Sequence, residues 1–228
     1  MNTFTYKDLY EENSRKVLEV NILLEKYCNF DCIFCPIGRS RNHADAVVDF
    51  GGISSALAEL GNKIDALKPD LVFINSKGEA LLHSGLKQVI DFIHNRGCAV
   101  RLLSNGYLLG RSEYAALANL CEECIGEIKT VAEEDFQKVQ RPLPGYTLRQ
   151  YTEGMAQFKK QYSGHFIFEV SIIKKYTDSD EAIARLQQII NAISPDELRV
   201  VDIGDERFMK VLGVTPERLA EVQNTLHI

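Results

Sequence analysis

The stretch of sequence that decides the fold runs from residue 17 to residue 36 and reads VLEVNILLEKYCNFDCIFCP. Its first eight residues are mostly apolar and partly β-branched, which predicts a buried strand over about residues 17–24. Three cysteines, Cys28, Cys32 and Cys35, follow on the loop after that strand. Because α/β folds build their sites on the loops that follow parallel strands, we expect these thiols to lie at a functional site.

The rest of the chain alternates between strand patterns and helix patterns. Extended runs predict five more strands, near residues 70–75, 100–104, 125–131, 165–173 and 198–203. Apolar residues spaced by three and four predict helices between them, near residues 53–67, 86–93 and 183–193. This order favours a parallel sheet with right-handed crossovers. The expected fold class is α/β, a six-unit (βα)6 partial TIM-type barrel, since six units are too few to close an eight-stranded barrel.

We expect residues 1–228 to form a single domain. No long linker rich in glycine, proline or serine divides the chain, and the predicted core covers about residues 17–203. A final helix is expected over about residues 215–226, because a threonine followed by a proline marks its start. Asp178 and Glu181 have the spacing of a capping box, which predicts another helix start at Asp178.

Composition and charge narrow the class of function. The chain has 45% hydrophobic and 25% charged residues and a net charge of -6, which gives no electrostatic reason to bind nucleic acid or an anionic membrane non-specifically. No run approaches the roughly 18 apolar residues of a membrane span, and the N-terminus is too polar for a secretory signal. We therefore expect a cytoplasmic protein with no membrane partner. In that reducing compartment, cysteines are metal ligands, redox groups or inert core thiols rather than disulfides.

The cysteine triplet has the chemistry of an iron-sulfur site. Three soft ligands on one short loop suit a cluster and leave one iron open to chelate a small molecule through an amino and a carboxylate group. Two alternatives are three buried core thiols and a zinc site. Zinc usually needs a fourth nearby ligand, and the closest histidine, His43, lies eight residues past Cys35.

The spacing Cys-x3-Cys-x2-Cys, with Phe34 directly before the last cysteine, resembles the signature of the radical S-adenosylmethionine (radical SAM) superfamily. The resemblance implies a 4Fe-4S cluster on the triplet and S-adenosylmethionine as the second cofactor, with Phe34 beside them. Further segments resemble the group that contains the archaeal 4-demethylwyosine synthases, namely residues 78–86, 104–106, 141–145 and 177–179. Residues 1–27, however, contain none of the cysteines that hold a second cluster in those synthases.

The same resemblance implies residues that contact S-adenosylmethionine. Gly78 and Glu79 resemble a Gly-Glu-Pro motif whose backbone and glutamate side chain hold the methionine amino group. Asn105 is expected to contact the ribose or the carboxylate. Glu169 and Lys174 lie on opposite sides of one predicted strand, and the residues of that strand are expected to contact the adenine and the methionine carboxylate. Each has an ordinary alternative: a βα turn for Gly78 and Glu79, a common Asn-Gly turn for Asn105, and a solvated lysine at a strand end for Lys174.

The other three cysteines are expected to lie far from the triplet. Cys98 precedes one predicted strand, and Cys121 and Cys124 precede the next, so all three should lie at the opposite end of the sheet. We interpret them as inert or partly buried thiols; a second metal site or a redox pair of Cys121 and Cys124 is the alternative.

The resemblance implies an oxidoreductase-type radical enzyme. A reduced 4Fe-4S cluster would cleave S-adenosylmethionine to a 5'-deoxyadenosyl radical acting on an unassigned substrate, which could be RNA, a peptide or a small molecule. A one-electron reductant such as flavodoxin or ferredoxin would be its partner. The alternatives are an activase of a glycyl-radical enzyme and a non-enzymatic electron carrier or redox sensor. The Gly78, Glu79 and Asn105 motifs count against a carrier, which needs no amino-acid site.

Overall fold

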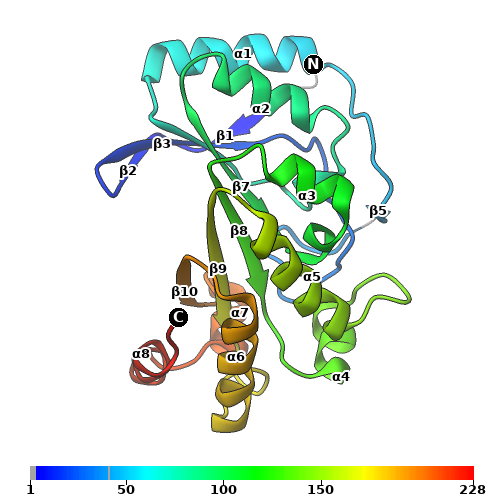
Figure 1. Cartoon of the computed structure of the whole chain (residues 1–228), viewed down its shortest axis with the longest axis vertical. Coiled ribbons are helices and arrows are strands. Elements are labelled where there is room, and N and C mark those ends of the chain that lie inside the picture. Colours follow the sequence, from blue (N-terminus) through cyan, green and yellow to red (C-terminus); the bar gives the residue numbers. More distant parts are fainter. Residues whose placement is uncertain (1–3, 41) are drawn as a thin grey trace.

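A computed structural model describes residues 4–40 and 42–228 and contains one dominant sheet (Figure 1). Six strands run parallel in chain order: β3 (Arg15–Asn21), β6 (Leu71–Ile74), β7 (Ala99–Ser104), β8 (Glu123–Ile128), β9 (His165–Ile172) and β10 (Glu197–Asp202). All six were predicted from the extended runs, and the predicted fold class, an α/β partial barrel, is confirmed. The sheet path ends at β1 on one side and at β10 on the other, so the barrel is open.

Two short strands precede the first parallel strand and were not predicted. They are β1 (Thr5–Tyr6) and β2 (Tyr10–Glu12), and both pair antiparallel with β3. A separate two-stranded sheet follows, formed by β4 (Tyr27–Cys28) and β5 (Asn42–His43). Strands of two or three residues are too short to leave a detectable alternation in the sequence.

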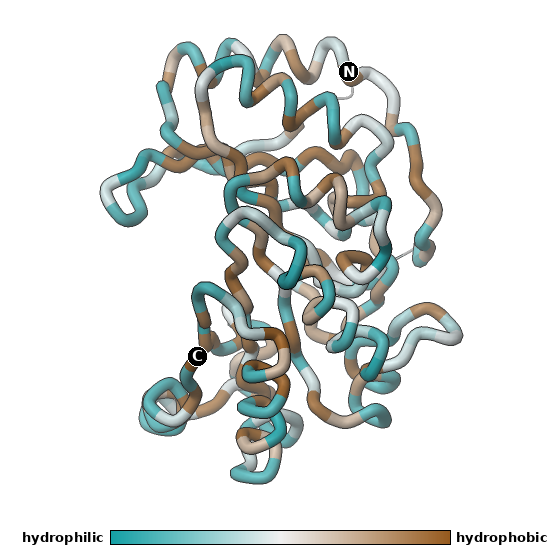
Figure 2. Tube along the Cα trace, viewed as in Figure 1, coloured by the Kyte–Doolittle hydropathy of each residue, from teal (hydrophilic) through white to brown (hydrophobic). Residues whose placement is uncertain are grey.

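Helices and short helical turns connect the parallel strands. The main helices are α1 (Ile53–Leu67), α2 (Leu86–His94), α3 (Ser112–Ala118), α5 (Leu148–Gln161), α6 (Asp180–Ile193), α7 (Glu206–Leu212) and α8 (Pro216–Thr225). The shorter turns are η1 (Ala80–Leu82), η2 (Tyr107–Gly110), α4 (Glu133–Asp135) and η3 (Phe136–Gln140). Figure 2 shows hydrophobic residues along the central strands and mostly hydrophilic residues on α8. None of the described helices has the length and apolar character needed to cross a membrane.

The predicted capping box at the start of α6 is wrong. Ser179 is the N-cap, and its hydroxyl accepts from the Ala182 backbone N–H at 3.2 Å. The Asp178 carboxylate instead accepts from the Lys175 backbone N–H at 2.7 Å, which closes the preceding turn. A capping box does occur at α5, where Thr147 and Gln150 satisfy each other's backbone N–H groups.

The interior of the barrel changes character along its strands. Nearer their amino ends the inner face carries the buried ion pairs of Arg101 with Glu12 and Glu123. It also carries an apolar cluster, made of Val17, Leu71, Phe73, Ile125 and Ile167. Beyond it, the period of two brings polar side chains to the same inner face: Glu127 follows Ile125, and Glu169 follows Ile167. The carboxyl end of the barrel is therefore polar and open, whereas the interior nearer the amino end is packed.

Candidate functional site

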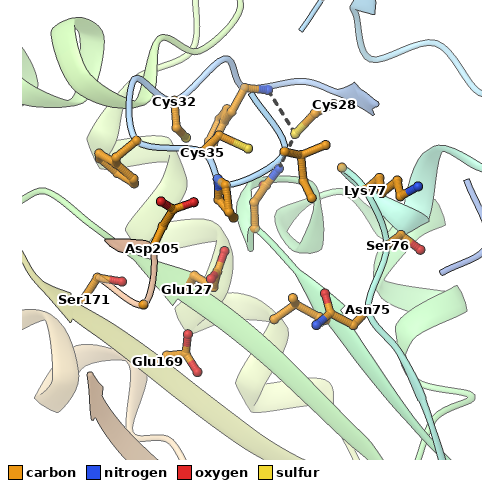
Figure 3. A pocket seen from close by; sticks show the side chains of 18 of the residues that line it. Cys28, Cys32, Cys35, Asn75, Ser76, Lys77, Glu127, Glu169, Ser171 and Asp205 are labelled. Atoms are coloured by element: carbon orange, nitrogen blue, oxygen red, sulfur yellow. Dashed lines mark hydrogen bonds between the residues drawn. The ribbon is translucent and has the colours of Figure 1, made fainter. Parts of the chain in front are cut away.

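A cavity of about 640 Å³ lies at the carboxyl ends of the parallel strands, within the size range of small-molecule sites. The cysteine loop covers it from one side, and polar side chains of β8 and β9 face it from the other (Figure 3). Its lining includes Cys28, Cys32, Cys35, Phe34, Gly78, Asn105, Glu127, Lys129, Tyr151, Glu169 and Ser171. The fold thus brings together most of the residues that the sequence predicted for the site.

Backbone hydrogen bonds fix the cysteine loop. The Asp31 N–H donates to the Gln140 carbonyl at 3.2 Å, and the Ile33 N–H donates to the Val139 carbonyl at 2.9 Å. The Asp31 carboxylate accepts from the Ser40 N–H at 2.7 Å, so it also anchors the far side of the loop. These contacts hold all three thiols in place over the cavity.

The sulfur atoms lie among groups that favour a thiolate or a sulfide. The Cys28 Sγ accepts from the Phe30 N–H at 3.4 Å and from the Asn105 Nδ2 at 3.6 Å. Burial nevertheless raises the pKa of Cys28, and burial raises the pKa of Cys32 to about 12, with Lys129 acting in the opposite direction. The metal-free thiols of Cys28 and Cys32 are therefore protonated near neutral pH, and metal binding at these two residues has to release protons.

The donor set fits a cluster better than a single ion. Among residues 4–40 and 42–228, no group of three or more His, Cys, Asp or Glu side chains converges on one metal ion. A cluster spreads its protein ligands over separate irons, so its thiolates need not converge on one point. Three soft thiols are the protein ligands that a 4Fe-4S cluster takes, and N–H donors to sulfur and a neighbouring ammonium group suit its negative charge.

Glu79 does not face the cavity, in contrast to the expected side-chain contact with an amino group. The residue is fully buried, and its carboxylate accepts from the Leu81 N–H at 3.1 Å, the Ser104 hydroxyl at 3.0 Å and the Asn105 N–H at 2.9 Å. Burial raises the pKa of Glu79 to about 7, although these three donors act against the shift. Glu79 therefore joins the loop after β6 to the loop after β7.

Gly78 is required by a close backbone approach. Its φ is +144°, and a Cβ at this position would clash with the Tyr27 carbonyl. That carbonyl accepts from the Glu79 N–H at 2.9 Å, which ties the loop after β6 to the residue before Cys28. Gly78 thereby fixes the cysteine loop and also lines the cavity beside it.

Asn105 and Phe34 both lie at the cysteine loop. Besides contacting Cys28, the Asn105 Nδ2 donates to the Asn29 Oδ1 at 2.6 Å, so one amide group holds the first turn of the cysteine loop. Phe34 is 5% exposed and packs with Val139 and Ile173 under the loop. Both residues also line the cavity.

Glu127 of β8 and Lys129, directly after that strand, complete the site, and neither was predicted from the sequence. The Glu127 Oε1 and the Lys129 Nζ are 2.7 Å apart. Burial alone would lower the pKa of Lys129, but the charge and the hydrogen bond of Glu127 act against it and raise that pKa, so the lysine stays charged. Burial and the neighbouring Glu127 raise the pKa of Glu169. The sequence offered one signal for them: Glu127 and Lys129 are two polar residues spaced by two at the carboxyl end of a predicted strand, so both point to the same side.

Lys174 is not brought to the cavity. Its side chain is exposed on the turn after β9, and its backbone N–H donates to the Leu212 carbonyl at 2.8 Å. Because Lys174 has the opposite parity to Glu169 on this strand, it leaves the inner face that Glu169 occupies. The structure therefore agrees with the alternative of a solvated lysine.

The second group of cysteines lies at the other end of the strands. Cys98 directly precedes β7, and Cys124 is the second residue of β8. Cys98, Cys121 and Cys124 are all free and buried, and burial raises the pKa of each thiol. None of the three lines the cavity.

Comparisons with known proteins agree with this geometry. The chain is 23% identical over 186 residues to GTPase Obg of Brachyspira hyodysenteriae, covering 81% of this chain and 27% of that protein. It is 22% identical over 185 residues to UPF0026 protein MJ1312 of Methanocaldococcus jannaschii, covering 80% of this chain and 58% of that protein. The chain therefore spans less than two thirds of the length of either curated relative.

The fold is similar to that of a solved structure of TYW1 with a lysine-pyruvate adduct bound. The TM-score is 0.65 at 16% identity, covering 92% of this chain and 72% of that one. At this identity the likeness concerns the fold alone. The sequence family described as the Radical SAM superfamily matches residues 23–186, well over half of the chain and including the whole cysteine triplet. The chain therefore belongs to the radical SAM superfamily.

Proposed function

We propose that this chain is a radical SAM enzyme, with a 4Fe-4S cluster on Cys28, Cys32 and Cys35 and S-adenosylmethionine in the cavity beneath them. When bound, the two cofactors supply one-electron cleavage of a sulfonium C–S bond and a 5'-deoxyadenosyl radical. The observation that carries the proposal is that three thiols on one loop line the same cavity as the polar carboxyl ends of β7, β8 and β9. An electron carrier alone would not need that cavity.

The charges in the cavity suggest how the cofactor is held. Lys129 lies next to Cys32 and is charged, so it is suited to the methionine carboxylate. An ionised Glu169 on β9 would repel that group, so we assign the carboxylate contact to Lys129, which follows β8, rather than to a residue of β9. The Asn105 amide and the Ser171 hydroxyl, which also line the cavity, are suited to the ribose or adenine.

The lining favours a peptide or a small molecule as the substrate over RNA. Five carboxylates and four lysines line the cavity, so a polyanion finds no net positive charge there. The carboxylates are Glu19, Glu127, Glu169, Asp202 and Asp205, and the lysines are Lys7, Lys26, Lys77 and Lys129. The cavity itself must exclude water from a radical intermediate, and the backbone-anchored cysteine loop provides one wall for that purpose.

The proposal is tested by loading and turnover. Anaerobically reconstituted protein should hold about four irons, and with dithionite and S-adenosylmethionine it should release 5'-deoxyadenosine. Replacing any one of Cys28, Cys32 and Cys35 by Ala should sharply lower the iron content, whereas Cys98→Ala should not. Full iron retention without all three thiols, or a loaded protein that never forms 5'-deoxyadenosine, would reject the assignment.

Lys129 offers a sharper test of the binding mode. Lys129→Gln should weaken S-adenosylmethionine binding by about 1.5 to 3 kcal/mol, the range for a hydrogen bond to a charged group, and should leave the iron content unchanged. Calorimetry on the reconstituted protein measures the affinity. The matched control is Lys87→Gln, which removes a surface ammonium paired with Asp91. If the Lys129 variant and the unmodified protein bind S-adenosylmethionine with equal affinity, Lys129 does not contact this cofactor.

A further inference from the structure

The outer side of the cysteine loop forms a surface with two other segments. The Arg207 Nη2 of α7 donates to the Pro36 carbonyl at 2.7 Å, and the Lys174 N–H donates to the Leu212 carbonyl of α7 at 2.8 Å. Beneath these bonds, Phe34, Ile173 and Phe208 pack in one apolar cluster. These contacts hold three segments together in one surface, which we call the α7 face: residues 32–39, 173–176 and 206–212.

The α7 face is basic although the chain is acidic. Its segments contain five basic residues and one acidic residue in a chain of net charge -6. The basic residues are Arg39, Lys174, Lys175, Arg207 and Lys210, and all five are exposed. Arg39 and Arg207 pair with Asp31 and Asp205, whereas the three lysines make no ion pair with any described residue.

The positive charge lies outside the cavity but next to the cluster cysteines. None of the five basic residues lines the cavity, where the substrate has to bind. Cys35, by contrast, is partly exposed and is followed by the exposed Pro36 and Ile37. Arg207 is also hydrogen-bonded to the carbonyl of Pro36, the residue directly after Cys35. A partner held by these basic residues would therefore lie close to a cluster, beside residues 35–37, which also line the cavity.

We propose that the α7 face docks an acidic one-electron carrier protein that reduces the cluster. The inference rests on the proposed function, which requires an electron from outside. The carrier is oxidised by one electron, and the cluster gains it, passing from the 2+ to the 1+ state. Charge complementarity of this kind speeds encounter and is weakened by salt. RNA, the other polyanion of suitable charge, is disfavoured because none of the five basic residues lines the cavity in which a substrate base would have to react.

Charge reversal on the α7 face tests the proposal. In Lys174→Glu/Lys210→Glu, reduction of the reconstituted cluster by reduced flavodoxin should have a second-order rate constant about tenfold lower at low salt, with a weaker salt dependence. Stopped-flow bleaching of the cluster absorbance measures it. The single variant Lys210→Glu should give a smaller reduction of the same kind.

The control makes the same change of charge elsewhere. Lys16 and Lys160 are exposed, at the start of β3 and the end of α5, so Lys16→Glu/Lys160→Glu lies at the opposite end of the barrel. This variant should be reduced by flavodoxin at nearly the unmodified rate. Equal slowing of both double variants, or no slowing of either, would overturn the proposal.

Two further measurements separate this inference from the proposed function. Dithionite should reduce the cluster of every variant to the same extent; a protein that holds no reducible cluster at all would refute the proposed function instead. Oxidised flavodoxin should bind the metal-free protein and bind the Lys174→Glu/Lys210→Glu variant less tightly. If that variant loses affinity for a tRNA transcript while its reduction rate is unchanged, the face is an RNA site and the proposal fails.

Discussion

Glu79 shows how one buried carboxylate couples the site to pH. Burial raises its pKa from 4.5 to about 7, so the unfolded chain loses this proton at lower pH than the folded protein does. Between those two values the folded state binds more protons, and its stability falls as the pH rises. The stabilising contribution of Glu79 is fully present below the pKa of the unfolded chain, and it is lost as the pH rises through the pKa of the folded protein.

We therefore expect the free energy of unfolding of the metal-free protein to contain a Glu79 contribution that falls by on the order of 3 kcal/mol across this interval. Glu79→Gln should remove it. Urea unfolding of both proteins at several pH values measures the difference, in which the other titrating groups cancel. A pH-independent difference between the two proteins would show that Glu79 has an ordinary pKa.

At the scale of elements, α5 joins the ends of two strands through one side chain. The Tyr151 hydroxyl contacts the carbonyls of Asn105 and Glu127, the residues at the carboxyl ends of β7 and β8 that line the cavity. Tyr162, at the end of the same helix, donates to the Cys121 carbonyl at 2.8 Å at the opposite end of the barrel. Both tyrosines thus bond a backbone carbonyl through their hydroxyl, one at the cavity and one at the opposite end of the barrel.

Tyr151→Phe and Tyr162→Phe should each lower the free energy of unfolding by about 1 to 3 kcal/mol, because each leaves a buried carbonyl without its donor. Only Tyr151→Phe should also weaken S-adenosylmethionine binding, since only it releases Asn105 and Glu127. Chemical denaturation and calorimetry give the two quantities. The positioning role of Tyr151 would be disproved by an unchanged affinity in a variant that shows the loss of stability.

At the scale of the molecule, the barrel separates two groups of thiols. Cys98 precedes β7, whereas Asn105, which contacts Cys28, follows it, so a strand of six residues, roughly 20 Å at 3.3 Å per residue, lies between the groups. A cluster cannot span that distance. The fold thereby supports the interpretation of Cys98, Cys121 and Cys124 as core thiols.

Changing Cys98, Cys121 and Cys124 together to Ala should preserve the iron content and the formation of 5'-deoxyadenosine. Stability should fall, because all three side chains are buried. Iron analysis of the reconstituted, folded variant decides the matter. Loss of about half the iron would demonstrate a second cluster and would restore the closer parallel with the wyosine synthases.

The features that the sequence determined by itself are those encoded within short windows. Strand and helix periods depend on neighbours two to four residues apart, so the six strands and the capped start of α8 could be predicted. The triplet spacing put three thiols on one loop and pointed to the right superfamily. Its assignment as the cluster ligand set, like the single-domain organisation, remains a prediction.

The tertiary structure alone decided where the individual side chains of the site point. Glu79 turns to Ser104 and Asn105, 25 and 26 residues away, because two donors meet its carboxylate there. The α7 face likewise joins Arg207 to Pro36 across 171 residues. No local pattern encodes such contacts, since they depend on which strands become neighbours and on the direction in which each strand ends.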